Sequence, residues 1–230
     1  RACLFRGADR GILLTDRRAA ASDTLATSYI LSQAVKTISR YDMVFAGRQA
    51  IDGDTAQVGP QCAEKLGIPQ VTYLEQLVSL DGPVVRIRRN IGHGWEIVEG
   101  KLPVLITVIG SANKPRPPKA RRVMRFKRAK VMAEIVGEVK AEQAGVSDDD
   151  VQAEAGRRAA AFEEKGLLLR QWSLDDIGAD LERCGLAGSP TKVFRVQSIV
   201  LTKEGYTEVQ ATEDGVRQMI HELVIDRTLG

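Results

Sequence analysis

The 230-residue sequence predicts an α/β fold built on a parallel sheet. Short apolar segments alternate with amphipathic ones over residues 11–67, and a glycine ends the strand-like run "MVFAG" at 43–47. The order strand, helix, strand, helix requires crossover connections, which place helices on the faces of a parallel sheet. The length suffices for one large domain, or for one domain with a long appendage.

The first elements follow from local signals. Residues 11–15 are an apolar run that predicts a buried strand, preceded by a helix end and a turn. Asp23 is an N-cap for an amphipathic helix over 23–38, and Gly67 closes a second helix that follows the 43–47 strand. Since an α/β domain rarely begins in mid-helix, we expect an N-terminal strand and helix of this fold to precede Arg1.

Residues 70–110 have the pattern of β-strands. The runs "QVTYLEQLVSL", "PVVRIRRN", "WEIVEG" and "LPVLITVIG" are separated by turn signals at Asp81-Gly82 and at 92–94. They predict a hairpin and a returning strand that extend the edge of the sheet. Together, residues 1–110 predict a Rossmann-like, nucleotide-fold-like domain.

The sequence changes character near Gly110, where we divide it into the domain 1–110 and an arm, 111–230. The segment "NKPRPPKARRVMRFKRAK" holds nine Lys or Arg and no acid. A helical stretch follows over 133–165, with Ser147 as a cap, then a strand at 193–201 and a last helix at 212–224. We interpret 133–169 as a helical insertion.

Composition excludes several classes of protein. A hydrophobic fraction of 43% without a long apolar run predicts a cytoplasmic protein with no membrane span. Three cysteines without a CxxC pair suggest neither a zinc site nor a disulfide framework. His93 and His221 are the only histidines and have no Ser or Cys motif beside them, so we predict no hydrolytic triad and no metal site.

The loop "GRQAIDGDTAQVGP" lies where ligands of parallel α/β sheets bind, after the carboxyl end of a strand. Gly47 lets a ligand approach the backbone, and the free amides that begin the next helix favour an anion such as phosphate. A structural turn with an Asp54–Gln57 capping box explains part of the same polar content. The loop matches neither the P-loop motif nor the GxGxxG fingerprint.

Five segments in this order resemble the β subunit of electron-transfer flavoprotein: "DMVFAGRQAIDGDTAQVGP", "LGIPQVTYL", "LPVLITV", "NKPR" and "GLAGSPTKV". The resemblance covers nearly the whole chain. It implies a heterodimer with an α subunit that holds the redox flavin, and electron transport without independent catalysis. The family's loop implies a site for AMP in simple carriers, or for a second FAD in electron-bifurcating members that use NADH.

The resemblance assigns the cofactor contacts to one loop. Its residues are Gly47, Arg48, Gln49, Ala50, Ile51, Asp52, Gly53, Asp54, Thr55, Ala56, Gln57 and Val58. Backbone amides suit phosphate, and the aspartates are expected to face ribose or backbone, because a carboxylate would repel phosphate. Arg48 is either a phosphate partner or a solvated charge. A small neutral residue at position 53 favours FAD over AMP, although Gly53 can also serve a left-handed turn.

The basic segment matches the family's loop for docking acyl-CoA dehydrogenases and other redox partners. The predicted docking residues are Lys119, Ala120, Arg121, Arg122, Val123, Met124 and Arg125. Val123, Met124 and Phe126 are either apolar anchors or the buried face of a helix. The net charge of the chain is only +3 and the basic segment holds a single aromatic residue, Phe126, which disfavours a nucleic-acid-binding module. The main alternative function is that of a stand-alone adenine-nucleotide-binding stress-type protein.

Overall fold

The computed structural model describes residues 1–51, 53–143, 145–193 and 208–225. The chain forms two compact units, Arg1–Lys192 and Val193–Gly230. The predicted strand at 193–201 falls almost entirely on residues outside the described ranges. In the second unit the predicted last helix is confirmed as α7 (Glu213–Ile225).

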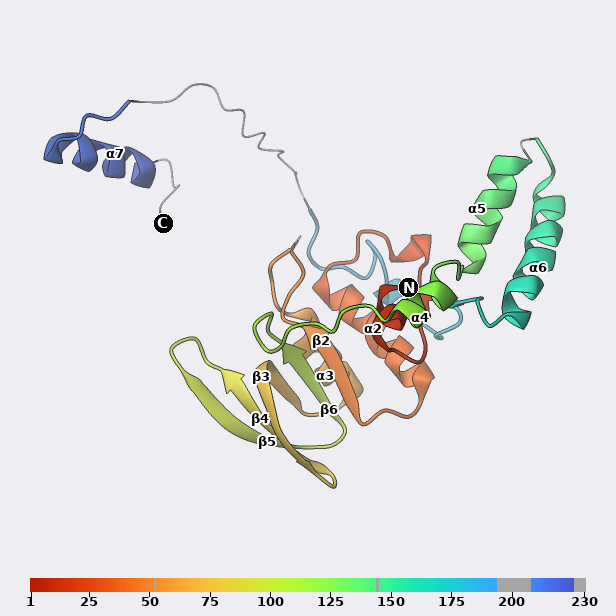
Figure 1. Cartoon of the computed structure of the whole chain (residues 1–230), viewed down its shortest axis with the longest axis horizontal. Coiled ribbons are helices and arrows are strands. Elements are labelled where there is room, and N and C mark those ends of the chain that lie inside the picture. Colours follow the sequence, from red (N-terminus) through yellow and green to blue (C-terminus); the bar gives the residue numbers. More distant parts are fainter. Residues whose placement is uncertain (52, 144, 194–207, 226–230) are drawn as a thin grey trace. The chain divides into compact units, whose positions relative to one another are not determined.

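A five-stranded sheet is the centre of the first unit (Figure 1). Its order is β2-β6-β3-β4-β5, where β2 and β3 are both parallel to β6, and β3, β4 and β5 are antiparallel neighbours. The mixed α/β sheet and the predicted hairpin at its edge are thus confirmed. The strands are β2 (Met43–Gly47), β3 (Gln70–Asp81), β4 (Val84–Asn90), β5 (Trp95–Lys101) and β6 (Val104–Val108).

The returning strand β6 does not extend the edge of the sheet but enters its middle, between β2 and β3. Its sequence "VLITV" is apolar almost throughout, as expected for a strand covered on both faces. Val104, Leu105, Ile106 and Thr107 are all buried. The predicted position of this strand at the edge is therefore wrong, because near-continuous burial requires neighbours on both sides.

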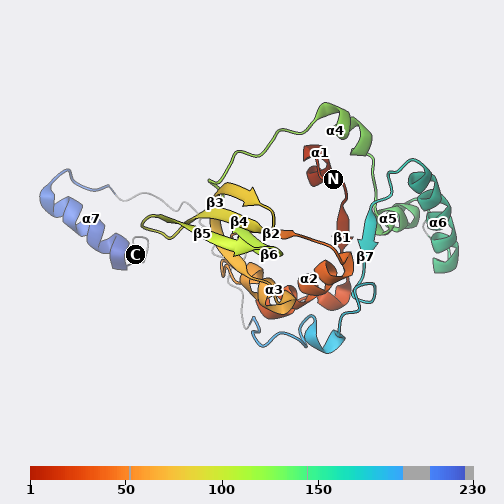
Figure 2. The ribbon, with the colours of Figure 1, turned by 90° about the horizontal axis from the view of Figure 1, so that it is seen from below.

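The predicted strand at 11–15 exists as β1 (Ile12–Leu14), but it is not part of the central sheet and not buried. It pairs in parallel with β7 (Arg170–Trp172), far along the chain (Figure 2). Ile12 and Leu13 are 36% and 44% exposed, because only Leu14 packs into a core cluster.

Helices α2 (Thr24–Ile38) and α3 (Val58–Leu66) follow β1 and β2. The predicted Asp23 cap is confirmed, since its carboxylate accepts from the amide of Ala26 at 2.9 Å. The left-handed Gly67 that closes α3 is confirmed as well. The Asp54–Gln57 capping box is wrong: Gln57 is itself the N-cap of α3 and makes no side-chain cap bond.

The predicted helical stretch after the basic segment is confirmed as two helices, α5 (Met132–Glu142) and α6 (Asp148–Glu164). The hydroxyl of Ser147 accepts from the amide of Asp150 and caps α6 as predicted. The remaining helices of the first unit are α1 (Ala2–Arg6), η1 (Arg17–Ala19), α4 (Ala120–Phe126) and η2 (Leu181–Arg183).

Residues 172–184 share a core with the N-terminal half of the chain. Leu174, Ile177 and Cys184 are buried against Tyr29 and Ile30 of α2. The compact first unit therefore continues to Lys192. The division near Gly110 into a nucleotide-binding domain and an arm stays a prediction.

Asp16 joins β1 to the turn after β7. Its carboxylate, 10% exposed, accepts from the guanidinium of Arg18 at 2.6 Å and from the amide of Leu174 at 3.1 Å. The hydrogen bond from the Arg18 side chain is the main reason why the pKa of Asp16 lies well below its usual 3.8; burial opposes it, and the backbone amides of Arg18 and Leu174 lower the pKa further.

Replacing Asp16 with asparagine is expected to destabilise the fold by about 2 kcal/mol at pH 7, because charge-assisted hydrogen bonds are lost. A lowered folded pKa contributes stability above the unfolded pKa and loses it as the pH falls toward the folded value. Urea unfolding of both proteins from pH 7 to pH 2 checks this. D16N should lose less stability below pH 4 than the unmodified protein, and parallel pH profiles would contradict the assignment.

Candidate functional site: an amide-lined loop beyond strands β2 and β6

The loop from Gly47 to Val58 begins at the carboxyl end of β2, beside the end of its parallel neighbour β6. Of the twelve predicted cofactor residues, Asp52 lies outside the described residues. The side chain of Ile51 is fully exposed, and Gly47 and Gly53 would meet nothing within 4 Å if they carried a Cβ. The loop is thus an open segment above the edge where ligands of parallel sheets bind.

The backbone of this loop changes between left-handed and right-handed conformations. Asp54 and Ala56 have φ values of 50° and 54°, in the left-handed region, whereas Gln57 is right-handed at φ −95°. Alternation of this kind turns successive amides toward one side and forms a concave anion site. Gly53 does not have positive φ, so the interpretation of Gly53 as a left-handed turn residue is wrong.

The free amides lie at the end of the loop. The Asp54 amide donates to the carbonyl of Ala50 at 3.1 Å and is not available to a ligand. Among the described residues, the amides of Thr55, Ala56, Gln57 and Val58 donate to no protein acceptor. Pro60 occupies the third position of α3, where a missing N–H costs no intrahelical hydrogen bond. The arrangement suits a phosphate group between Thr55 and α3.

Side chains fix the loop from both ends. Asp54 accepts a hydrogen bond from the side-chain amide of Gln49, so its carboxylate is turned into the loop. Gln57 accepts from the hydroxyl of Thr24 at 3.1 Å, which joins the beginnings of α2 and α3. Sequence reasoning missed Thr24, which is 33 residues from Gln57; the only available signal was its place after the Asp23 cap.

Gly59 sets the distance between α3 and the sheet. A Cβ at this buried position would lie 2.6 Å from Cγ2 of Thr107 and 3.6 Å from Cβ of Ala46. The hydroxyl of Thr107 in turn accepts from the amide of Tyr73 at 3.0 Å. Tyr73 has φ 59° and lies in an irregular part of β3, so this hydrogen bond supports a strained residue.

Arg48 of the loop also lines a neighbouring pocket of about 760 Å³. Its guanidinium lies 5.7 Å from the centre of the Tyr73 ring. Arg89 faces the same pocket, where its guanidinium donates to the hydroxyl of Thr72 at 2.8 Å. Arg89 is also ion-paired with Glu96 at 3.4 Å, so Arg48 and the aromatic ring of Tyr73 are the groups that make this side of the site attractive for an anionic, planar group.

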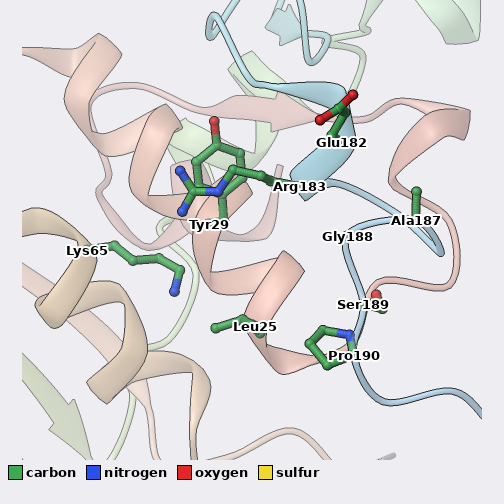
Figure 3. A pocket seen from close by; sticks show the side chains of 9 residues that line it. All are labelled: Leu25, Tyr29, Lys65, Glu182, Arg183, Ala187, Gly188, Ser189 and Pro190. Carbon is green, nitrogen blue, oxygen red and sulfur yellow. The ribbon is translucent and has the colours of Figure 1, made fainter.

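A second pocket, of about 350 Å³, lies between α2, α3 and the segment after η2 (Figure 3). The guanidinium of Arg183 lies 4.0 Å from the centre of the Tyr29 ring, and Lys65 extends toward the pocket from α3. The remaining lining residues are Leu25, Glu182, Ala187, Gly188, Ser189 and Pro190.

The "GLAGSPT" segment is bound to α2 within the first unit. The buried hydroxyl of Ser189 accepts from the amide of Asp23 at 2.8 Å, and the Asp23 carboxylate accepts from the amide of Thr191 at 3.0 Å. Burial raises the pKa of Asp23, but hydrogen bonds from the amides of Ala26, Thr191 and Leu25 outweigh it and lower that pKa. Asp23 is therefore a charged junction between α2 and this segment.

The predicted docking residues divide into two groups. Arg122 donates to the carbonyls of Leu4 at 3.1 Å and Ala8 at 2.7 Å, so its side chain holds α1 against α4. Lys119, Ala120, Arg121, Met124 and Arg125 are exposed, and Met124 is 64% exposed. The interpretation of Met124 as part of a buried helix face is thus wrong. Val123 and Phe126 are half-buried.

Within the part of the chain that the structure describes, no helix is long and apolar enough to cross a membrane. Over the same residues, no group of three or more His, Cys, Asp or Glu side chains could hold a metal ion.

Comparison with known proteins finds one family. Residues 1–139 match the model of the electron transfer flavoprotein domain. The electron transfer flavoprotein subunit beta of Clostridium acetobutylicum is 42% identical over 190 residues, which cover 83% of this chain and 58% of that protein. The same subunit of Thermoanaerobacterium thermosaccharolyticum is 37% identical over 97% of this chain and 71% of its own length.

A third relative is the caffeyl-CoA reductase-Etf complex subunit CarD of Acetobacterium woodii, which is 38% identical over 85% of this chain and 60% of its own length. The chain thus spans about three fifths of two of these relatives and 71% of the other. The family match covers more than half of the chain, and the identities exceed one third. The chain belongs to the electron transfer flavoprotein family and is similar to its β subunits.

Proposed function

We propose that this chain is the β subunit of a heterodimeric electron transfer flavoprotein and binds an adenine nucleotide at the loop from Gly47 to Val58. The free amides of Thr55 to Val58, at the carboxyl ends of two parallel strands, carry the proposal. They suit the phosphates of the nucleotide. Arg48 and Tyr73 suit the rest of a larger ligand that extends past the phosphates.

FAD is the favoured nucleotide, and AMP is the alternative. Bound FAD would supply electron-transfer chemistry at its isoalloxazine ring, whereas AMP has no redox group. The described loop presents no side-chain charge at Gly53 that would oppose a diphosphate, and Asp54 is turned toward Gln49. The pocket of about 760 Å³ beside Arg48 is within the usual size range of cofactor sites, roughly 300–1,000 Å³.

The nucleotide content of the purified complex tests the proposal. The chain is produced together with its α subunit, the complex is denatured, and the released nucleotides are identified by chromatography. Two FAD per heterodimer are expected. One FAD with one AMP would show that the second flavin is wrong, and the absence of any nucleotide beyond that of the α subunit would refute the site itself.

The C-terminal unit supplies the proposed contact with the α subunit. The helix α7 has exposed apolar side chains along one face, namely Val216, Met219, Ile220 and Val224, which are three, one and four residues apart, and Ile225 is exposed as well. A helix with such a face needs a covering surface. Residues 185–191 are hydrogen-bonded to Ser22 and Asp23, just before α2. We therefore assign the contact with the α subunit to residues beyond Lys192.

The exposed part of α4 is proposed to dock a redox partner, such as an acyl-CoA dehydrogenase, through an acidic surface on that partner. Replacing Arg121 and Arg125 with glutamate should slow association by about tenfold at low salt and flatten its salt dependence. Stopped-flow electron transfer with the complete heterodimer measures this, with nucleotide content as the control. Unchanged rates at low salt would contradict the docking role. Arg122 is left intact, because it holds α1.

A stand-alone adenine-nucleotide-binding protein remains the alternative function. The apolar face of α7 argues against it, since nothing within its own unit covers that face among the described residues. The purified chain distinguishes the two: a monodisperse monomer that binds nucleotide without an α subunit would favour the alternative.

A further inference from the structure

Helices α5 and α6 form a hairpin with its own core. Ile135 and Val139 of α5 are buried against Val151, Ala155 and Ala159 of α6. The two helices run side by side in both views (Figures 1 and 2). Because this apolar interior is satisfied within the hairpin, the outer face of α6 is not needed to complete the fold of the first unit.

The two ends of the α5–α6 hairpin are joined to each other, shortly after α4 in the sequence. The side chain of Lys130 donates to the carboxylate of Glu138 at 2.6 Å, and its backbone forms a parallel bridge with Leu168. The amide of Lys130 donates to Leu167 at 3.0 Å, and that of Leu169 donates to Lys130 at 2.7 Å. These bonds enclose both ends of the hairpin, four residues after the end of α4.

The basic segment before the hairpin and the hairpin itself carry net charges of opposite sign. Residues 113–130 carry nine basic and no acidic side chains, whereas residues 132–165 carry nine acidic and four basic ones. Three of the four bases of the hairpin are paired internally: Lys140 with Asp148 at 2.8 Å, Arg157 with Glu154 at 2.7 Å, and Arg158 with both Glu142 and Glu154 at 2.8 Å. The charge that the hairpin presents outward is therefore mainly negative.

The unpaired acids lie on one side of α6. Among the described residues, Asp149, Asp150, Glu163 and Glu164 are exposed and form no ion pair, and Asp150 accepts from the hydroxyl of Ser147. Asp149 and Glu163 are fourteen residues apart, which places them on the same helix face about 21 Å from each other. A partner that lies along this face meets acidic groups near both ends.

We propose that the α5–α6 hairpin is a second docking element that selects the redox partner by charge. The partner it fits is a protein whose acidic patch binds α4 and whose adjoining basic patch binds the outer face of α6. A uniformly acidic redox protein would be attracted by α4 and repelled by the hairpin, since like charges brought together cost several kcal/mol at an interface. This inference rests on the proposed docking role of α4.

Peptide probes separate the two elements. The complete heterodimer is titrated with three labelled peptides: one with a glutamate block and a lysine block joined by a Gly/Ser linker of about ten residues, which spans roughly 17 Å, and two in which a Gly/Ser block replaces one of the charged blocks. Fluorescence anisotropy at low salt gives the affinities. The peptide with both blocks should bind about tenfold more tightly than either of the others, because its two contacts are linked.

Three variants assign the contacts. D149K/E163K/E164K should remove the advantage of the two-block peptide and abolish binding of the lysine-only peptide. The control D42K/E64K/D81K changes three exposed acids outside the hairpin by the same charge and should preserve the advantage. R121E/R125E should weaken the glutamate-only peptide and leave the lysine-only peptide bound.

The outcomes are separable. Equal affinity for the two-block and glutamate-only peptides, or lysine-only binding that D149K/E163K/E164K leaves unchanged, would overturn the role of the hairpin. Glutamate-only binding that R121E/R125E leaves unchanged would refute docking at α4, while the lysine-only peptide still decides whether the hairpin recognises a basic surface.

Discussion

Replacing Gly59 with alanine is expected to destabilise the first unit by about 2–3 kcal/mol. The new Cβ would lie 2.6 Å from Cγ2 of Thr107, and overpacking of a buried contact costs about 1–3 kcal/mol. Thr107 cannot simply rotate away, because its hydroxyl accepts from the amide of Tyr73 at 3.0 Å. The measurement is the urea midpoint and slope of the unfolding transition.

The double variant G59A/T107S is the matched control. Serine at 107 lacks Cγ2 but keeps the hydroxyl for Tyr73, and the next contacts of the new Cβ, at 3.6 and 3.7 Å, are ordinary ones. The double variant should therefore be more stable than the sum of the two single effects predicts. Additive effects of G59A and T107S would show that the close approach of α3 to β6 does not limit this position.

The parts of the fold that were predictable are those with local causes. Asp23 and Ser147 cap α2 and α6 within three residues of the amides they accept from, so the sequence pattern suffices. The turn glycines Gly67 and Gly82 have positive φ, as their places after a helix and within a hairpin suggested. The alternation of strand and helix is also a local sequence pattern, and it predicted the parallel part of the sheet.

The errors have long-range causes. Arg122 contacts the carbonyls of Leu4 and Ala8, which are 118 and 114 residues away, so no local pattern separates it from the exposed Arg121 and Arg125. The central position of β6 depends on its pairing with both β2 and β3. The place of β1 outside the central sheet was not predictable locally, because its partner β7 is about 158 residues further along the chain.

The candidate site was predicted as a segment but not in its geometry. The sequence predicted free amides at the beginning of the next helix; in the structure the Asp54 amide is occupied, and among the described residues the free donors begin at Thr55. The left-handed residues are Asp54 and Ala56 rather than a glycine. Local preference would assign positive φ to Gly53, but Asp54, one of the residue types that adopt the left-handed region most readily after glycine, takes that conformation instead.

Replacing Gly53 with aspartate is expected to weaken nucleotide binding by about 10- to 100-fold. A carboxylate about 6 Å from a phosphate at an effective dielectric constant near 20 opposes it by roughly 3 kcal/mol, before screening by salt reduces the effect. Gly53 suits the test because a Cβ there meets nothing within 4 Å and its φ is not left-handed. The substitution therefore changes the charge of the loop with little change in its packing. Equilibrium dialysis of the heterodimer against FAD and against AMP measures the affinity.

The controls separate charge from shape. G53A adds only the Cβ, and G53N adds a neutral side chain of the same size as aspartate, so both should bind nucleotide nearly as well as the unmodified protein. The loss in G53D should shrink at high salt, because screening weakens the repulsion between carboxylate and phosphate. Equal affinities for G53D and G53N would place the phosphates away from this loop and contradict the proposed site.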